Sequence, residues 1–204
     1  SRPAVREVLR ALELLGIIKT VPGGGNYIAD DLDSWLIGPL SILFKLNNGY
    51  IRQTQQLRAA LEREMAILAA RKCTPLDAAE LWRILSSIDK AEDEKTRGEL
   101  DKELHTQIAK IADNPMIYSV LAAADQLIEN IIAGTRDYIM KKNRPEFKVD
   151  EQHRLLVEAI INNDEKGAEQ YMSEHMEIIE KCMDEMQKNS NNKRPANGIV
   201  IGGE

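Results

Sequence analysis

Apolar side chains recur at three- and four-residue intervals along most of the chain, which is the spacing of one face of an α-helix. Polar or proline-containing breaks such as Thr74-Pro75 and Asn114-Pro115 interrupt this pattern. Breaks this short place successive helices side by side and antiparallel. We therefore expect an all-α antiparallel bundle of six to seven helices, at 33–47, 50–72, 76–93, 96–112, 115–141, 149–162 and 165–188.

The first 30 residues follow a different pattern. Helical spacing at 3–15 ends at Gly16, and two β-prone stretches, 17–21 and 26–29, flank the turn Pro22-Gly23-Gly24-Gly25. A helix, a strand, a glycine turn and a strand in this order form the second half of a winged helix-turn-helix. We expect a partial winged-helix DNA-binding domain at 1–30, a helical domain at 31–188 and a polar tail at 189–204.

Charge is distributed unevenly between these parts. The whole chain carries a net charge of −6, which argues against non-specific nucleic-acid binding by the entire molecule. Residues 1–29 are basic, with four cationic side chains against two acidic ones, so the remainder carries the acidic excess. A small basic head on an acidic body is typical of a regulator in which the head alone contacts DNA.

Composition excludes two other classes of protein. No apolar run approaches the roughly 20 residues that a membrane-spanning helix needs, and the start of the chain does not read as a signal peptide. Cys73 and Cys182 are the two cysteines of the chain. Cys73 directly follows one predicted helix, Cys182 lies in another, and no CxxC motif is present. They indicate unpaired thiols in a reducing cytoplasm and not a disulfide framework.

The three histidines of the chain are candidates for metal binding. Each of them falls on the inward-facing stripe of a different predicted helix, and Asp101 precedes His105 by one helical turn. Burying three imidazoles and a carboxylate costs several kcal/mol unless they satisfy one another. A shared divalent cation such as zinc, nickel, manganese or iron would do so. The alternative is that each histidine is an ordinary core residue that donates to a backbone carbonyl.

Basic residues of the first helix allow two interpretations. Arg2, Arg6 and Arg10 recur every four residues and so share one helix face. That face suits DNA phosphates and guanine edges in a major groove. It is also compatible with a solvated surface on which the arginines pair with Glu7 and Glu13.

Taken together, the two parts resemble one known family, the GntR-type transcription regulators of the FadR subfamily with their C-terminal FCD ligand-binding domain. The N-terminal stretch SRPAVREVLRALELLGIIKTVPGGGNYIA resembles the recognition helix and wing of that family. Four segments of the body resemble its Arg/Leu-Glu helix, its Asp-x-x-x-His helix and its two later histidine helices: 57–71, 101–115, 151–164 and 168–179.

The resemblance implies specific roles. A divalent metal, zinc first, would be held by four ligands, namely Asp101, His105, His153 and His175. Arg58 would face the carboxylate of a small organic acid, a pairing that the planar guanidinium suits; pairing with Glu62 is the equal alternative. DNA contacts would come from Ser1, Arg2, Arg6 and the glycine wing around Gly24. The resemblance also implies a cytoplasmic homodimer that binds operator DNA in response to an effector, more often as a repressor.

One departure from the family affects the DNA-binding part. The winged helix of the family begins with two helices that precede the recognition helix, whereas this sequence starts at the third. A recognition helix without that pair cannot bury its apolar stripe in the usual way. We expect these 204 residues alone to bind operator DNA poorly.

Two other classes of function remain open at the level of sequence. A metal held by three histidines and one aspartate could activate water in a hydrolase, which would need a general base beside it. Glu103 and Glu174 are nearest in sequence, but each lies on a different side of its helix from the neighbouring ligands and should point elsewhere. The remaining alternative is a structural helical dimer with a buried histidine cluster.

Overall fold

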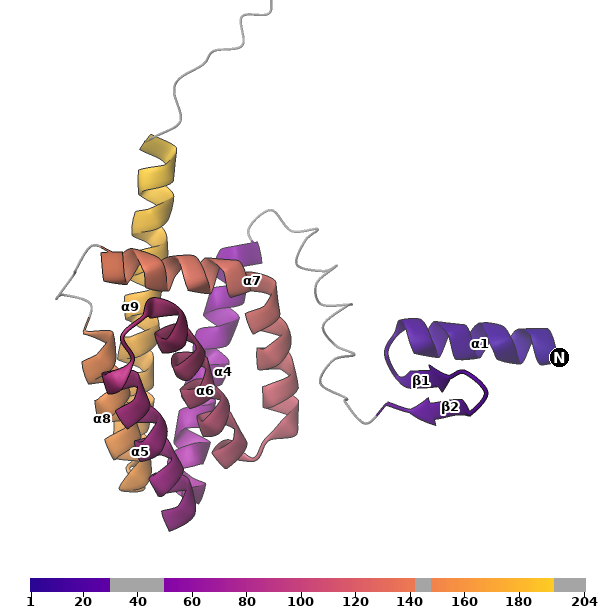
Figure 1. The fold of residues 1–204 in the computed structure, drawn as a ribbon, viewed down its shortest axis with the longest axis horizontal. Coiled ribbons are helices and arrows are strands. Elements are labelled where there is room, and N and C mark those ends of the chain that lie inside the picture. Colours follow the sequence, from indigo (N-terminus) through magenta and orange to yellow (C-terminus); the bar gives the residue numbers. More distant parts are fainter. Residues whose placement is uncertain (30–49, 142–147, 193–204) are drawn as a thin grey trace, which may run out of the picture.

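A computed structural model describes residues 1–29, 50–141 and 148–192 of the chain. The N-terminal unit contains α1 (Arg2–Leu14) followed by the antiparallel strands β1 (Ile18–Val21) and β2 (Gly25–Ile28) (Figure 1). Gly23 and Gly25 have φ angles of 76° and 105°, a region that glycine occupies without the strain of a Cβ atom. The predicted helix, turn and strands of the wing are thus present with small shifts at their ends.

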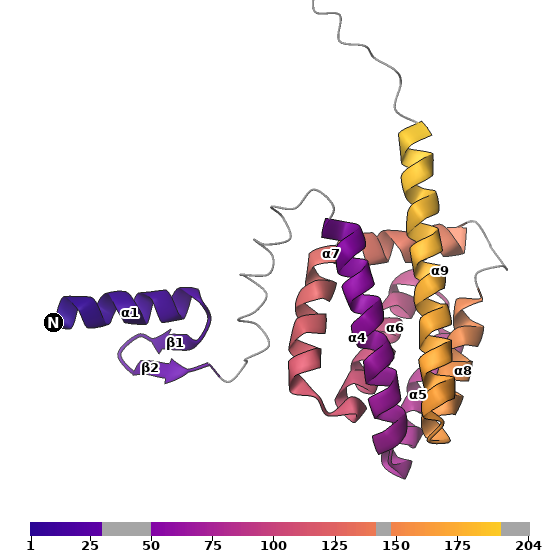
Figure 2. The same ribbon diagram turned by 180° about the vertical axis from the view of Figure 1, so that it is seen from behind.

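Six further helices follow in the described part of the chain. They are α4 (Tyr50–Lys72), α5 (Pro75–Lys90), α6 (Glu94–Ala112), α7 (Pro115–Lys141), α8 (Val149–Ile161) and α9 (Glu165–Asn192). Figures 1 and 2 show them gathered into one bundle, with α4 and α9 side by side on one side of it. The predicted helix at 33–47 and most of the predicted tail at 189–204 lie outside the described residues.

Local capping explains where two of these helices begin. The Thr74 side chain accepts a hydrogen bond from the Asp77 backbone N–H, and the Asp77 carboxylate accepts one from the Thr74 N–H, which forms a capping box. The chain leaves helical geometry at Ala91, and the Asp93 carboxylate then accepts from the Thr96 N–H. The expected boundaries at residues 93 and 96 therefore move to Lys90 and Glu94, because Asp93 is a cap and not a helical residue.

The hydrophobic core lies inside the helical bundle. Helix α4 packs against α6, α7, α8 and α9, and α9 packs in turn against α8. The largest fully buried apolar side chains are Met65, Leu81, Ile84, Leu85, Leu104, Ile108, Ile128, Leu156, Ile160 and Met172. Helix α1 has no buried residue, and Val5 and Val8 on it are each 58% exposed. Within residues 1–29, 50–141 and 148–192, the core thus lies in the bundle, and α1 has an exposed apolar face.

Helix α7 contains a break in its geometry. Ile128 has φ −116° and ψ 15°, so two helical segments meet there although the helix continues to Lys141. Its side chain is buried. The irregularity lies three residues after Asp125, which takes part in the polar network described below.

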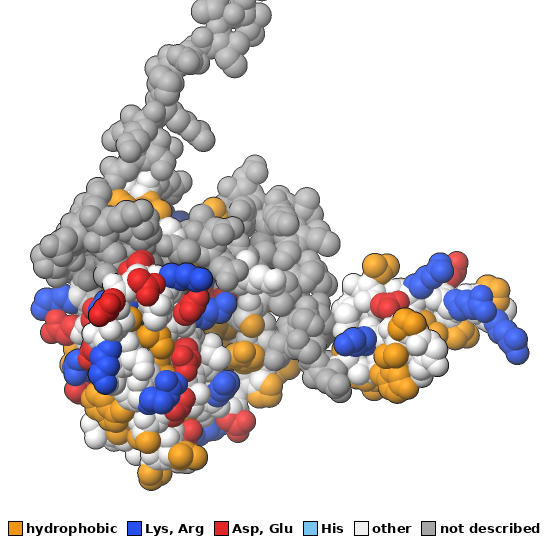
Figure 3. All heavy atoms as spheres, in the orientation of Figure 1, with side chains coloured by type: hydrophobic (Ala, Val, Ile, Leu, Met, Phe, Trp, Pro, Cys, Tyr) orange, Lys and Arg blue, Asp and Glu red, His pale blue; other side chains and the backbone are white. Residues whose placement is uncertain are grey.

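The outer surface of the bundle carries charges of both signs. Figure 3 shows acidic and basic side chains interspersed over the face in view. Several of these make ion pairs between helices, among them Arg71 with Glu165 and Arg154 with Asp89. Within the described part of the chain, no helix is both long and apolar enough to cross a membrane. Cys73 and Cys182 do not form a disulfide.

Candidate metal centre

Three helices bring the three histidines to one point in the bundle. His105 comes from α6, His153 from α8 and His175 from α9, and one candidate ligand atom of each lies within 4.8 Å of the others. The ring centroids are separated by 5.8 Å for His105–His153, 5.2 Å for His105–His175 and 4.7 Å for His153–His175. His153 and His175 are buried. The imidazoles thus form a compact nitrogen-rich cluster at a junction of three helices.

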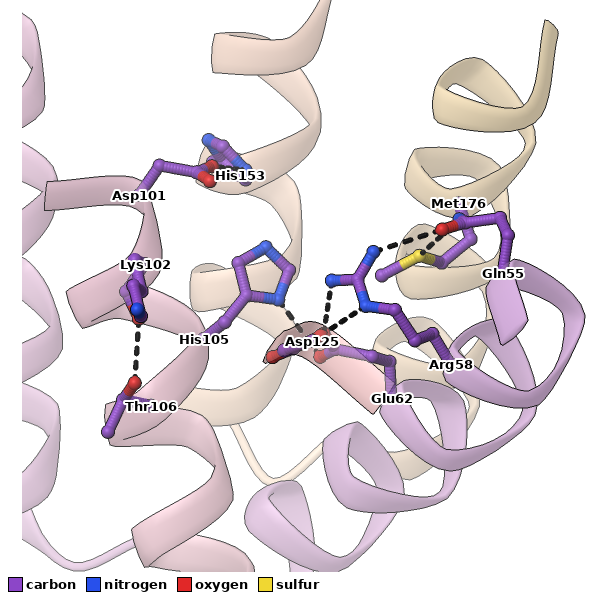
Figure 4. A network of polar contacts seen from close by, with 10 residues as sticks. All are labelled: Gln55, Arg58, Glu62, Asp101, Lys102, His105, Thr106, Asp125, His153 and Met176. Carbon is purple, nitrogen blue, oxygen red and sulfur yellow. Dashed lines mark hydrogen bonds and ion pairs between the residues drawn. The ribbon is translucent and has the colours of Figure 1, made fainter. Parts of the chain in front are cut away.

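Asp101 joins this cluster from the preceding turn of α6. Its Oδ1 atom lies 3.0 Å from Nε2 of His153, and its side chain is 13% exposed (Figure 4). Because Asp101 and His105 are four residues apart, the helix presents both to the same neighbours. The four residues singled out in the sequence are therefore adjacent in space. Three imidazole nitrogens and one carboxylate are a donor set that suits Zn²⁺ and other divalent first-row metals.

The helical stripes explain why these side chains point inward. His153 shares its face of α8 with Leu156, Val157 and Ile160, all of which are buried. His175 lies beside Met172 and Met176, which are also buried. The apolar positions fix how each helix rotates about its axis, and this rotation directs the histidines into the bundle.

A carboxylate on α4 forms a second layer behind His105. Oε2 of Glu62 lies 2.9 Å from Nδ1 of His105, and Oε1 accepts a hydrogen bond of 3.3 Å from Arg58 (Figure 4). Burial alone would raise the pKa of Glu62, but His105, Arg58 and His153 together lower it below its ordinary value. Glu62 therefore remains a carboxylate although its side chain is only 1% exposed.

Arg58 faces two carboxylates at once. Its Nε atom donates to Asp125 on α7, its Nη2 atom to Glu62, and its Nη1 atom donates a 3.0 Å hydrogen bond to Gln55. Burial raises the pKa of Asp125, and the positive charge of Arg58 acts against that rise. The pairing of Arg58 with Glu62 that the sequence left open is thus present, together with a second acidic partner.

Asp125 and the contact between Glu62 and His105 are two features of this network that the sequence did not predict. Asp125 is a lone acid inside the apolar stretch MIYSVLAAADQLI, and a charge in such a run is a signal of a buried partner. Glu62 was considered as a partner of Arg58 alone, since its distance from His105 in the chain conceals the contact.

A cavity of about 100 Å³ opens beside these groups. Arg58, Asp101 and the three histidines contribute to its lining, together with Arg97 and Asp150 from the first turns of α6 and α8. Arg97 donates to Asp150 over 3.0 Å. The histidine cluster and Arg58 thus face a common space, so a small molecule in that space would meet both.

The two acids considered as a general base lie elsewhere. Glu103 pairs with Arg83 of α5 and is exposed, and Glu174 accepts a hydrogen bond of 2.9 Å from Gln170 on its own helix. Neither residue lines the cavity beside the histidines. Their positions agree with the expectation that both point away from the cluster.

The candidate DNA contacts lie on the surface of the N-terminal unit. Ser1, Arg2 and Arg6 are exposed on or beside α1, and Gly24 is exposed at the tip of the wing. The hydroxyl of Tyr27 donates a 2.7 Å hydrogen bond to the Gly24 carbonyl, which steadies the turn. A Cβ atom on Gly24 would lie 3.1 Å from Cγ1 of Val21, so the turn leaves little room for a side chain there.

Comparisons with known proteins agree with this architecture. Residues 53–178, more than half of the chain, match the FCD domain family. The chain is 30% identical to the HTH-type transcriptional regulator YcbG of Bacillus subtilis, over 88% of this chain and 72% of that protein. It is 26% identical to the HTH-type transcriptional regulator LutR of the same organism, over 88% and 83%. The fold is similar to that of a Streptococcus agalactiae GntR protein, with a TM-score of 0.64, 24% identity and coverage of 89% and 82%. The chain therefore belongs to the GntR family of transcription regulators that carry an FCD domain.

Proposed function

We propose that this protein is a DNA-binding transcription regulator that senses a small organic acid through a divalent metal in its helical domain. The observation that carries the proposal is the meeting of Asp101, His105, His153 and His175 beside a cavity that Arg58 also lines. Zinc fits this set of three nitrogens and one oxygen, and nickel, manganese or iron fit it as well. When bound, the metal would supply a positive docking point for an acid's carboxylate.

Different residues of the chain would bind the metal and the acid. The histidines and Asp101 would hold the metal, while Arg58 would place a second cationic group on the same cavity. The acid is bound and released unchanged in this proposal, so the site needs no general base. This agrees with the positions of the two candidate bases. Glu103 forms an ion pair on the surface, and Glu174 accepts a hydrogen bond from Gln170.

The response of such a regulator would be a shift between arrangements of the bundle. An acid that binds one arrangement better than another favours the first by the difference in its affinities. In a cytoplasmic homodimer, that change would alter the spacing of two DNA-binding heads on a two-fold operator. The DNA would be contacted by Ser1, Arg2, Arg6 and Gly24. We propose that the protein is a repressor and that binding of the acid releases it from the operator.

Metal analysis combined with thermal unfolding tests the proposal. The purified chain should contain or take up one zinc ion, and a small carboxylic acid that chelates zinc only weakly, such as L-lactate, should raise the unfolding temperature of the zinc-loaded protein. At an acid concentration about 100 times its dissociation constant, the expected stabilisation is about 2.7 kcal/mol. After a chelator has removed the zinc, the acid should no longer raise the unfolding temperature.

Two substitutions of the same chemical type provide the control. Asp101→Asn should abolish the response to acid, whereas Asp89→Asn, which breaks an outer pair with Arg154, should leave it intact. A protein that takes up no zinc, or that responds equally to the acid after chelation, would contradict the proposal.

A further inference from the structure

Glu62 connects the histidine cluster to the rest of α4. It is buried, and its two oxygens have different partners: Oε1 accepts from Nη2 of Arg58 at 3.3 Å, and Oε2 lies 2.9 Å from Nδ1 of His105. A guanidinium can only donate, so the carboxylate accepts at Oε1. Because Glu62 is ion-paired with the Arg58 cation, it is a carboxylate and has no proton to donate at Oε2, so the bond at Oε2 has Nδ1–H of His105 as its donor.

This bond determines which ring nitrogen of His105 faces the other histidines. A neutral imidazole carries one N–H and one lone pair, and the lone pair is what binds a metal. With its proton on Nδ1 and directed at Glu62, His105 has Nε2 as its ligand atom. Figure 4 shows the Nδ1 side of the ring turned towards Glu62 and the opposite side turned away from it.

His105 differs in this respect from His153. The carboxylate beside His153 is Asp101, which belongs to the candidate ligand set itself. The carboxylate beside His105 lies outside that set, on another helix, and is anchored in turn by Arg58. Arg58 also donates to Gln55 and Asp125, which fixes the position of its guanidinium. Because Glu62 accepts from this guanidinium, the orientation of its carboxylate is fixed as well.

We propose that Glu62 is a positioning residue of the metal centre, which holds His105 as the Nδ1–H tautomer so that Nε2 binds the ion. The proposal rests on the proposed metal site and adds a residue to it. Carboxylates that orient a ligand histidine in this way raise the basicity of the ring and fix its rotation. Loss of such a partner weakens metal binding by about 10- to 100-fold.

Zinc affinity of the full chain, measured by competition with a chromogenic chelator, tests this role. Glu62→Gln should weaken zinc binding by about 10- to 100-fold. Glu103→Gln is the matched control, because Glu103 is on the same helix as two ligands but pairs outward with Arg83. Its zinc affinity should equal that of the wild type.

Spectroscopy separates positioning from a merely structural role. In the zinc-loaded wild type, a long-range proton–nitrogen NMR correlation should show His105 protonated at Nδ1 and metal-bound at Nε2. This measurement needs no variant, so it decides the question even where Glu62→Gln fails to fold. Zinc bound to Nδ1 of His105 would overturn the proposal, and so would an unchanged zinc affinity in a folded Glu62→Gln protein.

The outcomes also separate this proposal from the proposed function. If the wild type and Glu62→Gln bind zinc equally well, the proposed role of Glu62 is contradicted and the proposed metal site is not. If the wild type binds no zinc, both the proposed metal site and the proposed role of Glu62 are contradicted.

Discussion

Arg58 carries one positive charge between two carboxylates, and its removal should be costly. Its side chain is buried and bonded to Glu62 and to Asp125, of which Asp125 is 33% exposed. In an Arg58→Gln variant the two acids would face each other without a cation. Breaking a buried ion pair on one side costs about 3–5 kcal/mol, and we expect the lower end because Asp125 is partly solvated. Urea unfolding at neutral pH measures this loss.

The control for this prediction is an arginine on the same helix. Arg52 is 63% exposed and lies 3.5 Å from Glu180, so Arg52→Gln should change the free energy of unfolding by less than about 1 kcal/mol. Lowering the pH should also reduce the difference in the free energy of unfolding between Arg58→Gln and the wild type. Burial raises the pKa of Asp125, so this carboxyl takes up a proton early as pH falls, and its neutral form no longer repels Glu62. A difference that grows on acidification would contradict this explanation.

At the same scale, the sequence is informative about which side chains face inward but not about their partners across helices. His105, His153 and His175 could be predicted to lie inside, because each sits on a periodic apolar stripe. The bond between Glu62 and His105 joins residues 43 positions apart. Periodicity gives the rotation of each helix about its own axis. It does not give the offset between α4 and α6, on which that contact depends.

Among the elements, α6 depends on the ionised form of its N-cap. The Asp93 side chain accepts from the Thr96 backbone at 2.9 Å and from the Thr96 hydroxyl at 2.6 Å, and these bonds, the hydroxyl first, lower the pKa of Asp93 below 3.8. A lowered folded-state pKa stabilises the protein above the ordinary pKa of the group, and this stabilisation disappears as pH falls through the folded value. Asp93→Asn should therefore be less stable than the wild type at pH 6, with the difference closing below pH 3.8.

Urea unfolding over a pH series measures this convergence. Thr96→Val removes the hydroxyl that donates to Asp93 while it leaves the backbone donor, so it should reproduce part of the Asp93→Asn effect. Parallel loss of stability in the wild type and in Asp93→Asn across the acid range would show that the cap does not carry this pH dependence.

Helix identity could be predicted from the sequence better than helix boundaries. The six described helices of the bundle all correspond to predicted segments, since each buries a continuous apolar face. The start of α6 was placed two residues late, because a cap is a side-chain hydrogen bond and not part of the apolar repeat. The irregular Ile128 had no signal of the kind that marks a break, since neither Pro nor Gly stands beside it.

At the scale of the whole molecule, the core and the histidine cluster belong to the same set of helices. The buried apolar residues of the core cluster extend from Met65 to Met176, and the three histidines come from α6, α8 and α9. The N-terminal unit contributes no residue to that cluster. Folding of the bundle and assembly of the site should therefore be one event, in which the first 29 residues have no part.

Two deletions of equal length test this separation. A chain that begins at residue 30 lacks α1, β1 and β2 and should keep the unfolding temperature and the zinc affinity of the wild type. A chain that ends at His175 also lacks 29 residues, but it loses Met176 and Cys182 from the buried interior of the bundle. It also loses the end of α9, where Glu180 pairs with Arg52 of α4 and Glu185 accepts a hydrogen bond from Tyr138 of α7. It should lose cooperative thermal unfolding, because the cavity left by two core side chains and half a helix exceeds what a domain of this size tolerates. If the N-terminal deletion lowers the unfolding temperature of the bundle, the two parts are energetically coupled, and the N-terminal unit then contributes to the stability of the bundle.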